Sequence, residues 1–108
     1  MIGTVVNAEI VTGSRGKRGG TYIAFRTSEN LKKDDLVRLE IQGQHYFKVT
    51  DIAIIEKELL VSARETGYWA NALERKDNFD IRNLIDLKVT LITDTEVIQR
   101  INKEACWC

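Results

Sequence analysis

The chain has 108 residues, which is enough for one domain with a single core and too few for two. A hydrophobic content of 44% excludes an intrinsically disordered chain, and a formal net charge of zero, from 16 cations and 16 anions, excludes a uniform polyelectrolyte. No apolar run approaches the roughly 18 residues of a membrane-spanning helix, and the first residues lack a secretory pattern, so we expect a soluble cytoplasmic protein.

The first part of the chain predicts two strands joined by a glycine-rich basic connector. Residues 2–11 are rich in β-branched side chains, and residues 21–26 alternate between two faces, with Ile23 and Phe25 on one of them. Between them, the stretch TGSRGKRGGTY holds four glycines and three cations but no acid. Residues 12–21 are therefore expected to form a flexible basic hairpin loop.

The middle of the chain predicts an antiparallel meander that follows a polar connector, SENLKKDD. Residues 36–41 alternate apolar and charged side chains, which is typical of a strand with one buried and one wet face. Gln-Gly at 42–43 fits a two-residue hairpin turn, where glycine adopts a positive φ. The chain returns through HYFKVTDI, reverses again at 56–57 and continues as a third strand over 58–64.

The last third predicts two helices that flank a sixth strand. Residues 68–76 hold good helix formers and predict a short helix, whereas residues 84–92 alternate and predict a strand. Thr93 and Glu96 match a capping box, with Thr93 as the N-cap of a helix near 94–105. The apolar stripe of that helix consists of Val97, Ile98, Ile101 and Ala105.

Together these elements predict a mainly β fold in a single domain, residues 1–108. The fold class that fits best is a small SH3-like or OB-like antiparallel barrel, with one short helix near 68–76 and a C-terminal helix near 94–105. Closing the sheet into a barrel would protect its edge strands. A split sheet with the last helix packed across it is the alternative. Residues 106–108 form a cysteine-containing tail.

Charge is unevenly distributed despite the zero total. Residues 13–33 carry six cations and one acid, a local net charge of +5, whereas residues 34–70 carry four cations and seven acids, a local net charge of −3. Such a bipolar chain suits nucleic acid on one face. It equally suits head-to-tail contacts between copies, in which the basic side of one meets the acidic side of the next.

The sequence offers no cluster that is typical of an enzyme. His45 is the single histidine, and we interpret it as a half-exposed strand residue. The glycine-rich stretch is not a phosphate-binding P-loop, because Arg18 follows Lys17 where serine or threonine is required. Cys106 and Cys108 supply too few ligands for a zinc site and are either free thiols or partners in an intermolecular disulfide. We therefore expect no catalysis, no metal and no cofactor.

Three interpretations of the basic loop at 13–20 stay open: a solvated hairpin loop, a contact with nucleic-acid phosphates, or an arm that orders on a neighbouring protein subunit. The candidate contact residues are Arg15, Lys17, Arg18, Tyr22, Arg26, Lys32 and Lys33. In the nucleic-acid interpretation Tyr22 would stack on bases if its ring is exposed, whereas Phe25 is expected in the core. Tyr68 and Trp69 form a second candidate, either as core plugs or as exposed interface aromatics.

Residues 25–63 combine an acidic connector, an alternating strand, a glycine turn and an aromatic return strand. The positions that carry this layout are Leu31, Asp34, Asp35, Val37, Leu39, Ile41, Gly43, Tyr46 or Phe47, Val49, Ile52, Leu59 and Val61. The layout is similar to the run LxxGDxVxxxGxxYxVxxV of the small head–tail joining proteins of tailed bacteriophages, also called head-closure, stopper or tail-attachment proteins. Asp34 stands where that family often has glycine.

The resemblance implies an SH3-like barrel without catalysis that assembles as a ring between portal and tail, in the virion or the host cytoplasm. It further implies that the basic loop reaches an adjacent subunit or lines the DNA passage. No single residue carries over from the family as a site. A small nucleic-acid-binding barrel that uses the loop at 13–20 is the alternative function.

Overall fold

A computed structural model describes residues 1–13, 18–43, 45–67 and 71–105. Its elements in chain order are β1 (Gly3–Val11), β2 (Gly20–Thr27), β3 (Leu36–Leu39), β4 (Tyr46–Ile55), β5 (Glu58–Thr66), the 3₁₀ turns η2 (Leu73–Arg75) and η3 (Ile81–Leu84), β6 (Lys88–Leu91), and the helix α1 (Thr95–Ala105).

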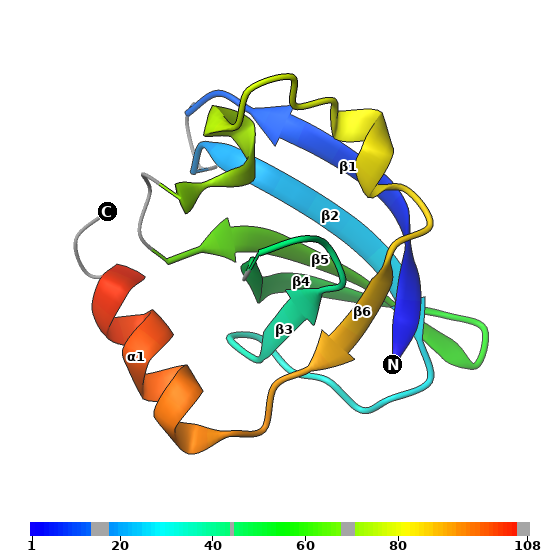
Figure 1. The fold of residues 1–108 in the computed structure, drawn as a ribbon. Coiled ribbons are helices and arrows are strands. Elements are labelled where there is room, and N and C mark those ends of the chain that lie inside the picture. Colours follow the sequence, from blue (N-terminus) through cyan, green and yellow to red (C-terminus); the bar gives the residue numbers. More distant parts are fainter. Residues whose placement is uncertain (14–17, 44, 68–70, 106–108) are drawn as a thin grey trace.

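The strands form a closed barrel in the order β1-β2-β5-β4-β3-β6, and each neighbouring pair is antiparallel (Figure 1). The meander predicted in the middle of the chain is confirmed as β3-β4-β5, and β2 returns beside β5 in a Greek-key arrangement. Because β6 pairs with both β1 and β3, it closes the ring, although its ladder with β1 covers only Gly3 and Thr4 of that nine-residue strand. The mainly β prediction is therefore confirmed.

The core fills the inside of the barrel because the apolar residues repeat with the period of the strands. On β2, Ile23 and Phe25 are buried as predicted, and they pair with Ala63 and Val61 of β5. The fully packed cluster comprises Val5, Ile23, Phe25, Leu31, Val37, Leu39, Phe47, Val49, Val61, Ala63, Leu73, Leu84 and Val89. Its members come from every strand, so the core ties the whole ring together.

Positive φ angles mark the tight reversals. Gly43 has the predicted positive φ, +95°, but the β3–β4 connection is longer than the predicted two-residue turn, because β3 ends at Leu39 and β4 begins at Tyr46. Ile55 pairs with Glu58, so residues 56–57 form the predicted two-residue turn between β4 and β5, with Glu56 at φ +58°. These turns fix the register of the meander and thereby determine which side chains share a face.

Two predicted elements are wrong in part. The short helix predicted over 68–76 is, within the described residues 71–76, a single 3₁₀ turn whose Leu73 plugs the barrel end. The sixth strand is confined to Lys88–Leu91 instead of 84–92, because η3 occupies 81–84 and Asp86 turns the chain with φ +71°. The local sequence patterns did not predict the 3₁₀ turn at 73–75 or the interruption of the strand pattern before Lys88.

The C-terminal helix is confirmed, but its cap differs from the prediction. The side chain of Asp94, not that of Thr93, accepts a hydrogen bond from Glu96 N at 2.9 Å. On the outer face of the barrel, Ile101 of the predicted apolar stripe packs with Leu36 and Tyr46, and Val97 and Ile98 of the same stripe pack against this cluster. Figure 1 shows α1 outside the ring of strands. No helix in the described ranges is long and apolar enough to span a membrane.

Asp80 caps η3 and pairs with Arg82, whose Nη2 lies 2.8 Å from Oδ2. This side-chain hydrogen bond lowers the pKa of Asp80 from 3.8 to about 2. Because the folded-state pKa is depressed, the pair stabilises the fold above pH 3.8, and this contribution is lost as the pH falls towards 2. We expect Arg82→Gln to return the pKa towards 3.8. Carboxyl NMR titration measures it, and an unchanged value would contradict the assignment.

Candidate functional site

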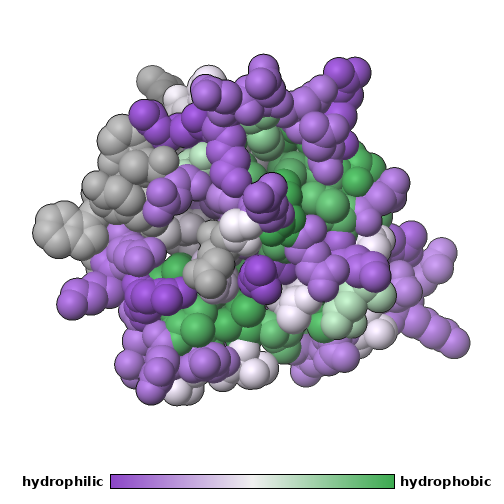
Figure 2. All heavy atoms as spheres, in the orientation of Figure 1, coloured by the Kyte–Doolittle hydropathy of each residue, from purple (hydrophilic) through white to green (hydrophobic). Residues whose placement is uncertain are grey.

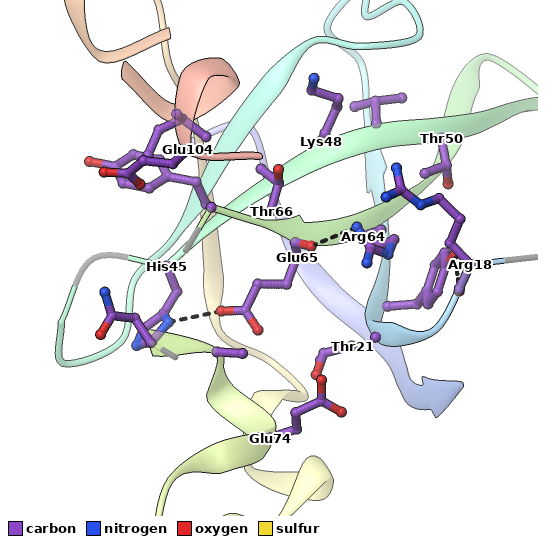
Figure 3. Close-up of a pocket in the computed structure, with 18 of the residues that line it drawn as sticks. Arg18, Thr21, His45, Lys48, Thr50, Arg64, Glu65, Thr66, Glu74 and Glu104 are labelled. Atoms are coloured by element: carbon purple, nitrogen blue, oxygen red, sulfur yellow. Dashed lines mark hydrogen bonds and ion pairs between the residues drawn. The ribbon is translucent and has the colours of Figure 1, made fainter. Parts of the chain in front are cut away.

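An open cleft of about 1100 Å³ lies outside the barrel. Its floor is the outer face of β2, β5 and β4, and its rims are residues 71–76, the β2–β3 connector and the last turns of α1 (Figure 3). Polar residues cover most of the face shown in Figure 2, with apolar residues grouped in a few places between them. The cleft itself is lined by charged, polar and apolar side chains, among them Lys48, Thr50 and Ile101.

Arg64 lies at the centre of the floor, in a cross-strand row with Tyr22 of β2 and Lys48 of β4. Its Nε donates to Gly19 O at 2.8 Å, and Nη1 donates to Glu65 O at 3.4 Å. Gly20, at φ +140°, leaves room for this arrangement, because a Cβ there would approach Arg64 Nε to 3.2 Å. The guanidinium is thus held in place by the base of the glycine-rich loop.

Arg18 reaches the same cleft from the end of that loop. The Tyr22 hydroxyl donates to Arg18 O at 2.8 Å, which anchors the backbone where the loop joins β2. Tyr22 is only 8% exposed, so the exposure that stacking on bases requires is not met. Tyr22 instead positions Arg18 at the rim (Figure 3).

Lys33 completes a group of four cations that we call the cationic wall: Arg18, Lys33, Lys48 and Arg64. The connector that carries Lys33 is fixed to β4, because Asp34 N donates to Val49 O at 3.0 Å. Within the described part of the chain, no member of the wall takes part in an ion pair. The carboxylates that also line the cleft are Asp34, Asp51, Glu65, Glu74 and Glu104.

His45 differs from its sequence interpretation as a half-exposed residue, because it is 4% exposed and lies at one end of the barrel. Its Nδ1 is 3.0 Å from Glu65 Oε2, and Glu65 Oε1 accepts from Leu73 N at 2.9 Å. Glu65 thus connects the β3–β4 turn to residues 71–76 and holds one rim of the cleft. No local sequence pattern indicates this contact, because the two partners are twenty positions apart.

The other predicted site residues are dispersed. Arg26 lies outside the cleft and pairs with Glu58 at 3.2 Å, and Lys32 is an exposed residue of the connector. Arg18 and Lys33, two of the candidate contact residues, both line the cleft, whereas Lys48 and Arg64 were not among the candidates. The predicted positions that lie outside the described residues are Arg15, Lys17, Tyr68, Trp69, Cys106 and Cys108.

The described residues contain no group of three or more side chains able to hold a metal ion. Comparison with known proteins gives no match, whether with a family model, a curated protein or a solved structure. What the protein does must therefore be inferred from its geometry and charge.

Proposed function

We propose that the protein is a non-catalytic docking module that joins copies of itself, and neighbouring subunits, head to tail. The tip of the β4–β5 hairpin of one copy would enter the cleft of the next. The observation that supports this most is that one β4–β5 ribbon carries an exposed apolar tip at one end and, towards the other end, two members of the cationic wall, Lys48 and Arg64.

The hairpin tip has the character of an interaction surface. Ile54 is 80% exposed and Ile55 is 38% exposed, which is unusual for large apolar side chains next to each other at a turn. Residues 51–58 contain three acids and one lysine. An apolar anchor with a negative surround complements the cationic wall, whose members take part in no ion pair among the described residues.

The two ends of the ribbon cannot meet within one molecule. Lys48 and Ile55 are separated along β4 by a distance of about 20 Å. A contact between tip and cleft must therefore form between copies, with different surfaces on the two partners. Such a heterologous contact closes into a ring or continues as a filament, according to the rotation between successive copies.

A protein segment suits the cleft better than a nucleic acid does. Asp34, Asp51 and Glu104 would repel a polyphosphate, whereas a peptide can pair with both signs of charge. The rings of Tyr22 and Tyr46 are buried, so among the described residues of the cleft they offer no stacking platform.

The setting that we propose is that of a head–tail connector subunit of a tailed phage. The layout of residues 25–63 supports it, as does the β3-β4-β5 meander within a closed barrel. An SH3-like assignment of the barrel belongs to the same proposal, with an OB-like assignment as its alternative. His45 has no hydroxyl or thiol partner among the described residues, which favours a role without nucleophilic catalysis.

Mixing two variants tests the head-to-tail contact. Ile54→Asp removes the tip and Lys48→Glu damages the cleft, so each variant alone should be monomeric in light scattering, whereas the unaltered protein associates. An equimolar mixture should form dimers and nothing larger, because one intact tip meets one intact cleft. Val6→Asp, at an exposed apolar position of β1, is the matched control and should associate normally. A monomeric unaltered protein would refute the proposal.

The nucleic-acid alternative makes a separate prediction. Under it, changing Arg15, Lys17 and Arg18 together to alanine weakens oligonucleotide binding and makes that binding less dependent on salt. Electrophoretic mobility shift at several salt concentrations measures both effects. If the unaltered protein binds neither DNA nor RNA at low salt, this alternative is excluded.

A further inference from the structure

We infer that Arg64, Lys48 and Arg18 form a binding site for one oxyanion group, a carboxylate or a phosphate. The inference shares its cleft with the proposed function and deepens it, because it identifies which chemical group the cleft would hold. A free phosphate and a carboxylate of a docked protein segment are the two sources of that group.

The first argument is the juxtaposition of Arg64 and Lys48. These residues are directly opposite each other in the β4–β5 ladder, so their side chains leave the same face with Cβ atoms about 5 Å apart. Like charges in this position destabilise a sheet. No carboxylate of the described residues pairs with either cation. An oxyanion between them would remove this repulsion.

The second argument is the fixed orientation of the Arg64 guanidinium. Two backbone carbonyls, Gly19 O and Glu65 O, hold Nε and Nη1, whereas Nη2 has no partner among the described residues. The donors that remain are therefore preorganised, so little side-chain entropy is lost when an anion binds. Glycine at position 20 leaves the space that this orientation of Arg64 needs, because a Cβ there would lie 3.2 Å from Arg64 Nε.

The third argument concerns size. Arg18 approaches from the loop side, and its backbone is fixed by the Tyr22 hydroxyl. Asp34 and Asp51 also line the cleft, and their negative charges restrict favourable anion binding to the surroundings of Arg64 and Lys48. The site is therefore suited to one compact group and unsuited to a long polyanion.

Two simple probes, inorganic phosphate and acetate, test the site in the full-length protein at low ionic strength. Bound phosphate should shift the backbone amide NMR signals of Gly19, Gly20 and Arg64. Arg64→Gln should weaken phosphate binding about tenfold, because a charge-assisted pair of hydrogen bonds is lost. Arg26→Gln, which changes an arginine outside the cleft, should bind as the unaltered protein does.

A stability measurement gives a second readout that does not depend on Arg64 variants. Without added anion, Lys48→Gln should have a higher melting temperature than the unaltered protein, because the like-charge pair is removed. Phosphate should raise the melting temperature of the unaltered protein and leave that of Lys48→Gln almost unchanged. A nonspecific salt effect would instead change the melting temperatures of both proteins by a similar amount.

The outcomes separate the two sources and the two proposals. Phosphate that binds more tightly than acetate indicates a phosphate ligand, whereas similar weak binding of both, together with dissolution of head-to-tail assemblies, indicates a docked carboxylate. Binding of either probe by a protein that stays monomeric supports the site and refutes the proposed function. Millimolar phosphate and acetate without effect on NMR signals or melting temperature would overturn the inference, even if the protein assembles.

Discussion

Replacing Phe47 with alanine is expected to lower the free energy of unfolding by about 4 kcal/mol. Phe47 is fully buried on β4, where its backbone pairs with Val37 of β3 and Glu65 of β5. Truncation removes apolar surface and leaves a cavity in a ring whose backbone cannot collapse without breaking strand pairs. Because a domain of this size is marginally stable, the loss is a large fraction of its total stability.

Urea unfolding followed by circular dichroism measures this change. Ile54→Ala is the matched control, since it truncates an apolar side chain on the same strand that is 80% exposed. It should change the free energy of unfolding by less than about 0.5 kcal/mol. Similar losses for the two variants would mean that the barrel interior is not the core of the folded protein.

The strands were predictable because their signal is local. The period-two alternation predicts correctly that Ile23 and Phe25 of β2 are buried, and Gly43 has the expected positive φ. Alternation does not predict that Tyr22 and Leu36, on the other face of their strands, are buried as well. The strand pairs that close the ring were harder to predict from local patterns, because β6 pairs with both β1 and β3 and so joins residues far apart in the chain. Alternation over 84–87 was misleading, since η3 and the turn at Asp86 also bury apolar residues there.

The site was predicted only in part, for a related reason. Arg18 and Lys33 stood out because they lie in a basic stretch. Lys48 and Arg64 each lie on the outer face of a strand. A single cation in such a position is usually just a solvent-exposed residue without a function. Their importance arises from register, which places one directly across from the other. Counting the β4–β5 pairing outward from the turn at 56–57 would have placed Lys48 opposite Glu65, because a register shift between Val49 and Asp51 makes Arg64 its partner.

Replacing Glu65 with alanine is expected to lower the free energy of unfolding by about 3 kcal/mol, because two buried donors lose their acceptor. His45 Nδ1 and Leu73 N both hydrogen-bond to this carboxylate, at 3.0 Å and 2.9 Å. Since Leu73 anchors residues 71–76, hydrogen exchange at its amide should also become faster.

Glu65→Gln should lose less than about 1.5 kcal/mol, because the amide retains an acceptor for Leu73 N. Glu74→Ala, which removes an exposed carboxylate from the same rim, should leave both the free energy of unfolding and the exchange at Leu73 nearly unchanged. These differences separate a buried bridging role from a general effect of charge in the cleft. If Glu65→Ala and Glu74→Ala have equal effects, Glu65 does not hold the rim, and the cleft owes its shape to other contacts.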